Sequence, residues 1–195
     1  CKPFLLDTVA FFEDCLTVER DGELVLAPSS SPENVIDDDV WIAPNATMTI
    51  AAVKQLLRTV LRERDALGVG PERVRHWETL LAKMPPYQVG ANGALKEWTW
   101  PGIENREAHR HASHLYPLYF GVDPEVDDSE TLREACRVAI DRRMEFRRHE
   151  AGGDMAFGIV QLGLSAAHLG DTELAYECVE YLVNSYWSPA MVSLH

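Results

Sequence analysis

The chain has 195 residues, with 18 Lys and Arg against 31 Asp and Glu, so its formal net charge is −13. This acidic balance argues against nucleic acids and anionic membrane surfaces as partners, because both require clustered basic side chains. It places no restriction on neutral ligands such as sugars. Apolar residues make up 46% of the chain, enough for a buried core. No apolar run approaches the roughly 18 residues that a membrane-spanning helix needs.

The first residue is Cys1 rather than Met, and no signal peptide is visible. We therefore expect a processed product or a piece of a longer polypeptide, from which a targeting signal could have been removed. The length suits one domain or part of a larger one. The sequence leaves open whether the protein is secreted or cytoplasmic.

Apolar spacing and helix-ending signals predict most of the secondary structure. Gly68 ends one helix and Pro71 begins the next, consistent with Gly beyond a helix end and Pro in a first turn. Ser129 is a candidate N-cap for a later helix. The predicted helices cover residues 3–18, 47–67, 71–83, 129–148, 155–169 and 173–186.

The connections between these helices alternate between short and long. Residues 23–27 form a short extended stretch, residues 28–45 and 84–106 read as long loops, and residues 109–120 are mixed. Loops of this length inside compact domains are usually functional or disordered. Paired helices with almost no strand predict an all-α toroid or solenoid built from antiparallel hairpins, with the long loops at one common end.

The cysteines give no sign of a metal site. No CxxC spacing occurs, which argues against a structural zinc site. Cys15, Cys136 and Cys178 each stand among apolar residues of predicted helices. Because free cysteines are commonly buried, we expect these to be buried free thiols.

Three irregular stretches concentrate side chains that suit a sugar site: residues 28–34, 93–98 and 109–116. Aromatic faces stack on the apolar faces of sugar rings, and planar charged groups bind hydroxyls in pairs. A carboxyl group there could act as a general acid if burial raises its pKa.

From composition alone, each of these stretches also has a simpler interpretation. Glu33 could bond to nearby backbone amides in a Ser-Pro turn, and Glu97 with Trp98 could be a packing pair. The spacing of His109 and His111 allows a metal site, but no acidic partner is fixed by the sequence. We therefore expect neither a metal nor a cofactor.

The order and spacing of five short motifs resemble glycoside hydrolase family 95. The succession is Ser-Pro-Glu-Asn at 31–34, Ala-Thr-Met at 46–48, Pro-Pro at 85–86, Gly-x-Leu-x-Glu-Trp at 93–98 and His-Arg-His-x-Ser-His-Leu-Tyr at 109–116. The resemblance runs over nearly the whole chain, and the last motif is the most specific. It implies that residues 1–195 form part of an (α/α)6 catalytic barrel, within a multidomain enzyme that also has β-rich domains.

The resemblance also implies a reaction and roles for individual residues. Members of the family hydrolyse terminal α-L-fucosyl or α-L-galactosyl linkages in glycans with inversion of configuration. Glu33 matches the general acid, and Arg110 and His111 match the pair that contacts the sugar. Glu97 and Trp98 match a motif that lines the same cleft, so we expect them to be substrate-binding residues.

Other parts of the family's site fall outside these residues. An Asn-x-Asn pair lies upstream of the acid, and the Asp that serves as base follows the segment that ends here at His195. The chain is therefore expected to be inactive alone, with a glycan as substrate and the rest of the same polypeptide as partner. Thr49 replaces an Asp common in the family, and Gly152-Gly153 stands where Gly-Trp is usual, so the identity of the sugar stays open.

Two alternatives to a hydrolase remain, an inactive sugar-binding relative and a helical-repeat interaction protein. The hairpin over 156–186 resembles solenoid repeats, but no helix-pair unit recurs at a fixed period. An inactive relative would lack the acid, whereas Glu33 is present. The hydrolase hypothesis further predicts that Glu33, Trp98, Arg110 and His111 converge on one cleft.

Overall fold

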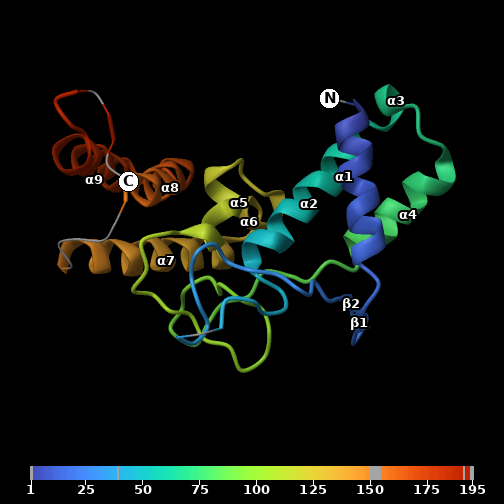
Figure 1. Cartoon of the computed structure of the whole chain (residues 1–195), viewed down its shortest axis with the longest axis horizontal. Helices are drawn as coiled ribbons and strands as arrows, with labels where there is room; N and C mark the ends of the chain where they lie inside the picture. The colour runs from blue at the N-terminus through green and yellow to red at the C-terminus, as the bar shows by residue number, and fades with distance from the viewer. Residues whose placement is uncertain (1, 39, 150–154, 191, 194–195) are drawn as a thin grey trace.

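The computed structural model describes residues 2–38, 40–149, 155–190 and 192–193 (Figure 1). In these ranges the only sheet is one antiparallel pair, β1 (Glu19–Arg20) and β2 (Glu23–Leu24). The fold is all-α, as predicted, and fits part of a helical toroid. The helical elements are α1 (Lys2–Cys15), α2 (Thr47–Arg62), α3 (Arg64–Leu67), α4 (Pro71–Ala82), the 3-10 turn η1 (Ser113–Leu115), α5 (Tyr116–Tyr119), α6 (Pro124–Asp127), α7 (Glu130–His149), α8 (Ala156–His168), α9 (Thr172–Tyr181) and the π turn η2 (Leu182–Tyr186).

Helix α2 organises the first half of the molecule. Its buried residues recur every three or four positions, at Ile50, Val53, Leu57 and Val60, so one face is apolar. That face packs against α1, α4 and α5 (Figure 1). The helix predicted over 47–67 is divided at Glu63 into α2 and α3.

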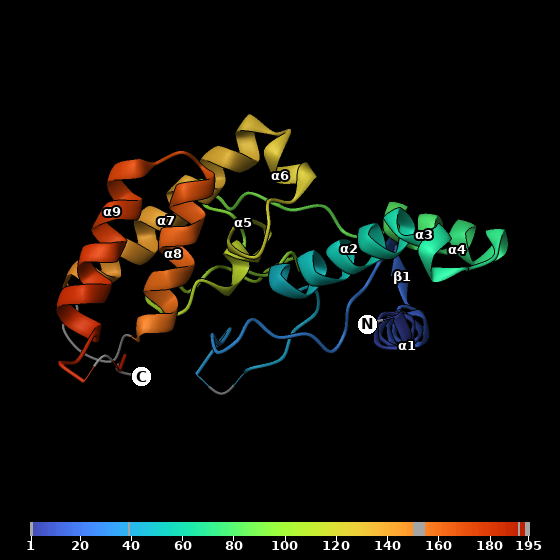
Figure 2. The ribbon, with the colours of Figure 1, turned by 90° about the horizontal axis from the view of Figure 1, so that it is seen from above.

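Capping positions fix where several helices begin and end. Gly68 follows α3 in the left-handed region at φ 63°, and Pro71 opens α4, as predicted. Ser129 caps α7, since its hydroxyl accepts a hydrogen bond from the Leu132 N–H at 3.3 Å. The Asp171 carboxylate accepts a hydrogen bond from the Leu174 N–H at 3.0 Å and caps the start of α9. Because only a short turn separates α8 from α9, the two helices form a tight hairpin (Figure 2).

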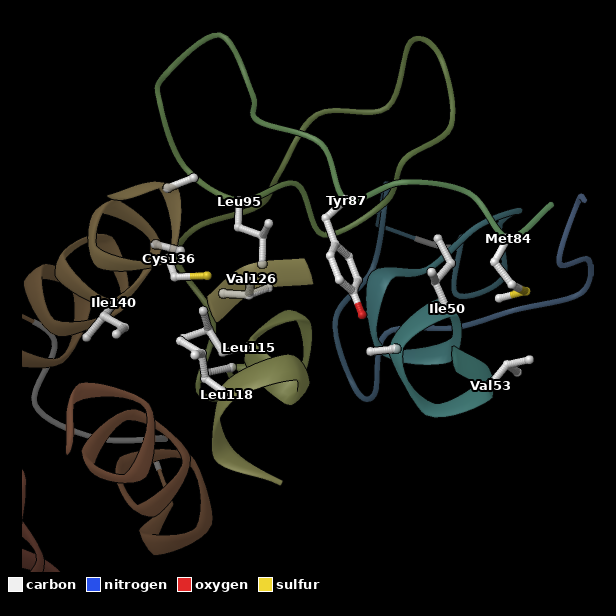
Figure 3. Close-up of a cluster of buried hydrophobic side chains, with 14 of the residues drawn as sticks. Ile50, Val53, Met84, Tyr87, Leu95, Leu115, Leu118, Val126, Cys136 and Ile140 are labelled. Carbon is white, nitrogen blue, oxygen red and sulfur yellow. The ribbon is translucent and has the colours of Figure 1, made fainter. Parts of the chain in front are cut away.

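One hydrophobic core connects the two halves. Leu95, from an irregular segment, packs with Leu115, Leu118 and the α7 residues Cys136 and Ile140 (Figure 3). The same cluster of buried residues continues into α2. Long-range packing through a loop residue therefore joins helices that are distant in the chain.

The thiols only partly follow the prediction. Cys136 and Cys178 are buried and free, as expected. Cys15, the last residue of α1, is also free but exposed, so its predicted burial is wrong. Cys1 and the Gly152-Gly153 pair fall outside the described residues.

The two long loops contact each other on one side of the helices (Figure 1). Ala46 and Trp98 form an isolated β-bridge, the Thr47 N–H donates to the Glu97 carbonyl at 3.0 Å, and the Thr99 N–H donates to the Asn45 carbonyl at 2.9 Å. This confirms that the long loops meet at a common end. Among the described residues, no helix combines the length and apolar character needed to span a bilayer.

Candidate active site

A cleft of about 500 Å³ opens where the first long loop, α2, the 109–115 segment and α8 meet. Sulfur and aromatic side chains provide most of its wall, and a carboxylate, an imidazole, a hydroxyl and an amide provide its polar groups. Such a mixture suits a ligand with both apolar and hydrogen-bonding faces. The lining residues are Pro32, Glu33, Met48, His111, Ser113, Tyr119, Met155, Phe157 and Gln161.

Glu33 lines this cleft and contacts two residues of the 109–115 segment. Its side chain is 55% exposed, and its Oε2 accepts a hydrogen bond from the Arg110 guanidinium. The Glu33 N–H donates to Nδ1 of His111 at 3.0 Å. The Ser113 hydroxyl donates to the Pro32 carbonyl directly before Glu33. The structure therefore places Glu33, Arg110 and His111 side by side, as the sequence predicted.

His111 lies between the Glu33 turn and the apolar wall of the cleft. Burial, together with the nearby Arg110 guanidinium, lowers the pKa of His111. Nδ1 of His111 lies 3.0 Å from the Glu33 amide nitrogen, which donates to it, and 3.1 Å from the Pro32 carbonyl oxygen. The edge of the ring meets Phe157, with 5.9 Å between ring centroids. His111 thus links the backbone of Glu33 to the apolar wall of the cleft.

Glu97 lies in the interior beneath the cleft rather than on its surface. It is 1% exposed, and its carboxylate accepts hydrogen bonds from Ser31 Oγ at 2.7 Å, Asn34 Nδ2 at 2.7 Å and Arg143 at 2.8 Å. Burial raises the pKa of the Glu97 carboxyl, while Arg143, Ser31 and Asn34 act in the opposite direction. The expectation that Glu97 contacts substrate is corrected, because its oxygens are already engaged and shielded.

Trp98 is likewise not available to a sugar. The residue is 0% exposed and packs with Ala43 and Ala46 in a small separate cluster. The expected stacking of the Trp98 ring on a sugar is therefore corrected, and the cleft takes its aromatic faces from Tyr119 and Phe157.

Two buried arginines of α7 support the segment that carries Arg110, and sequence analysis missed both. Arg143 is 1% exposed and donates to the backbone carbonyls of residues 106 and 107. Arg147 is 3% exposed and donates to the Arg110 carbonyl and, at 3.3 Å, to the Tyr186 hydroxyl. Their four-residue spacing on the face with Ala139, Ile140 and Met144 was the available signal.

Gly158 of α8 allows this support to come close. A Cβ added there would stand 1.8 Å from the Arg110 carbonyl oxygen and 2.2 Å from an Arg147 guanidinium nitrogen. Only a residue without a side chain permits that approach. The position of the Arg110 backbone therefore depends on α8 as well as on α7.

Lowering the pH should destabilise the folded chain through His109. The Nδ1 of His109 accepts a hydrogen bond from the His111 N–H at 3.1 Å. Burial and the nearby Arg143 charge lower the pKa of His109 to about 4. The unfolded chain, with an ordinary histidine pKa of about 6.5, then binds the proton more readily, so stability present above pH 6.5 is lost as pH falls towards 4.

We therefore expect His109→Asn to flatten the fall in Tm between pH 6.5 and 4, because Asn offers an acceptor without titrating. Thermal unfolding across this pH range measures the effect. His76→Asn, which removes an exposed histidine of α4, is the matched control. A variant that loses Tm with acid as steeply as the wild type would contradict the prediction.

The described residues contain no group of three or more His, Cys, Asp or Glu side chains that could hold a metal ion.

A half-exposed carboxylate at an open cleft fits one of the two carboxyl groups that glycoside hydrolases use. The model of the family described as "Glycosyl hydrolase family 95 catalytic domain" matches residues 2–194. The chain belongs to this family, which confirms the resemblance seen in its motifs. "Alpha-L-fucosidase 2" of Arabidopsis thaliana is 28% identical over 148 residues, covering 73% of this chain. The chain covers 18% of that relative's length.

Proposed function

We propose that the protein containing this chain is an inverting glycoside hydrolase that removes terminal α-L-fucosyl or α-L-galactosyl groups from glycans. The observation that carries the proposal is the position of Glu33, whose carboxylate opens on the cleft beside Arg110 and His111. Family membership supports the reaction class, and the name of the Arabidopsis relative favours a fucoside.

In the proposed reaction, the Glu33 carboxyl gives its proton to the glycosidic oxygen as the bond from that oxygen to the anomeric carbon breaks. Water attacks the anomeric carbon from the opposite face and loses its proton to a second carboxylate. Inverting enzymes place these carboxyl groups about 6.5–9.5 Å apart, leaving room for the water. By family resemblance the second carboxylate and the Asn pair belong to other parts of the polypeptide, so this chain supplies the acid side.

The neighbours of Glu33 have distinct tasks in this scheme. Arg110 is paired with Glu33 here, and sugar hydroxyls can take over its N–H donors when substrate enters. Glu33 is then free to face the leaving oxygen. His111 holds the Glu33 backbone in place through its amide. Tyr119 and Phe157 offer apolar surface to the C–H face of a sugar ring.

The full-length protein and this 195-residue chain, assayed side by side on 2′-fucosyllactose, test the proposal. We expect the full-length protein to release fucose and the isolated chain to release none, because the proposed base belongs to another part of the polypeptide. Proton NMR during the first turnovers should show β-L-fucose, the inverted anomer, before mutarotation. The α-anomer appearing first would exclude inversion, and a folded full-length protein without activity on fucosides and galactosides would favour a sugar-binding relative.

A further inference from the structure

A fully buried ion pair lies next to the turn that carries Glu33 and to the segment that leads to Arg110. Arg143 of α7 donates to Glu97 Oε2 at 2.8 Å, and both side chains are 1% exposed. Neither residue lines the cleft. Any effect of this pair on a substrate must therefore pass through the groups that the two side chains hold.

On the Glu97 side, the pair holds the turn that presents Glu33. Glu97 Oε1 accepts from the Ser31 hydroxyl at 2.7 Å, and Oε2 accepts from the Asn34 side-chain amide at 2.7 Å. Ser31 stands two residues before Glu33, and Asn34 directly follows it. The carboxylate of Glu97 thus fixes the chain on both sides of Glu33.

On the Arg143 side, the pair holds the segment that leads to Arg110, the partner of Glu33. The second nitrogen of the guanidinium donates to the Arg106 carbonyl at 2.6 Å and to the Glu107 carbonyl. The Asn34 amide donates to the same Arg106 carbonyl at 3.0 Å. Both loops are therefore tied to one ion pair, and through it to the rigid helix α7.

Stability alone does not require charges at this place. Removing two charges from water is costly, and well-packed apolar side chains of similar volume are often as stabilising as a buried ion pair, or more so. Charged hydrogen bonds, however, define direction in a way that apolar contacts do not.

We propose that Glu97 and Arg143 are positioning residues that aim the Glu33 carboxyl at the leaving oxygen, acting through Ser31, Asn34 and the 106–107 carbonyls. This inference rests on the proposed function of Glu33 as the acid. A displacement of about 1 Å can cost about 10²-fold in rate. The loss should concern proton donation above all, because the pair fixes the turn on both sides of Glu33.

The test is the double variant Glu97→Leu/Arg143→Met in the full-length protein, since it replaces the pair with apolar groups and leaves no lone buried charge. We expect folded protein whose kcat on 2′-fucosyllactose falls about 10–100-fold, with KM changed far less. On 4-nitrophenyl α-L-fucoside, whose leaving group needs little acid help, the loss should be much smaller. A merely structural defect would lower both rates together.

A second variant and a control keep the test decisive if the double variant does not fold. Glu97→Gln keeps the volume of the side chain and one acceptor oxygen but weakens the hydrogen bonds to Ser31 and Arg143. We therefore expect kcat on 2′-fucosyllactose to fall again more than the rate on the aryl fucoside, but by a smaller factor than in the double variant. Lys54→Met breaks another ion pair, between the buried Lys54 and the partly exposed Glu125 at 2.6 Å, and neither residue lines the cleft. It should leave the ratio of the two rates unchanged.

Glu33→Gln, assayed in parallel, separates the two hypotheses. If Glu33→Gln shows the selective loss and folded pair variants keep the wild-type ratio, the positioning role is overturned and the acid assignment stands. If Glu33→Gln itself shows no selective loss, the proposed function fails, and the inference fails with it.

Discussion

Glu33→Gln in the full-length protein should lower kcat on 2′-fucosyllactose by about 10²–10⁴-fold, the contribution typical of general acid catalysis. Gln has the size of Glu and an oxygen that can still accept from Arg110, but it has no proton to give to the leaving group. Because the Glu33 side chain is half exposed, the free energy of unfolding should change by no more than about 0.5 kcal/mol.

Steady-state kinetics on the oligosaccharide and urea unfolding measure the two parts of this expectation. Glu104→Gln, which changes an exposed carboxylate of the neighbouring loop, is the matched control and should behave as wild type. The oligosaccharide is essential, because an activated aryl leaving group would conceal the loss of the acid. A wild-type rate for Glu33→Gln on 2′-fucosyllactose would show that another group donates the proton.

Gly158→Ala is expected to cost about 1–3 kcal/mol of stability, as overpacked sites typically do. Helix propensity alone would favour the change by about 1 kcal/mol. The added Cβ would stand 1.8 Å from the Arg110 carbonyl oxygen, so α8 or the Arg110 segment must move. Since Arg110 is proposed to bind the sugar, KM for the fucoside should rise as well.

Urea unfolding midpoints and KM values test this second expectation. Gly70→Ala is the control, because an added Cβ there meets nothing within 4 Å and φ is −74°. A Gly158→Ala variant at least as stable as wild type would contradict the close approach of α8 to the Arg110 carbonyl.

Much of the fold was predictable because the helices follow local rules. The apolar spacing predicted the buried face of α2. Gly68 and Pro71 correctly predicted where one helix ends, after α3, and where the next, α4, begins. The convergence of Glu33 with Arg110 and His111 came from family motifs, since residues 77 positions apart have no local signal for contact.

The burial of Glu97, Trp98 and Arg143 was less accessible to sequence reasoning. A carboxylate and a tryptophan in a long irregular stretch are expected at a surface, because most loops lie there. Arginine in a helix is expected to face solvent, because it is rarely fully buried without a partner. Glu97 and Arg143 neutralise each other, and this pairing allows both to be buried. Because the two residues lie in different segments, neither segment alone indicates the pairing.

The passage of the hydrophobic core through an irregular segment limits how this protein can be re-engineered. Ala94 and Leu95 are 0% exposed, and the Leu95 N–H donates to the Ala135 carbonyl of α7 at 2.9 Å. Exchanging this segment between relatives, as one would graft a surface loop, would transplant part of the core without its matching helix. Mutant libraries that seek a different sugar preference are better directed to Met48 of α2 and Phe157 of α8. Both side chains line the cleft, and substituting them leaves the 94–95 segment in place against α7.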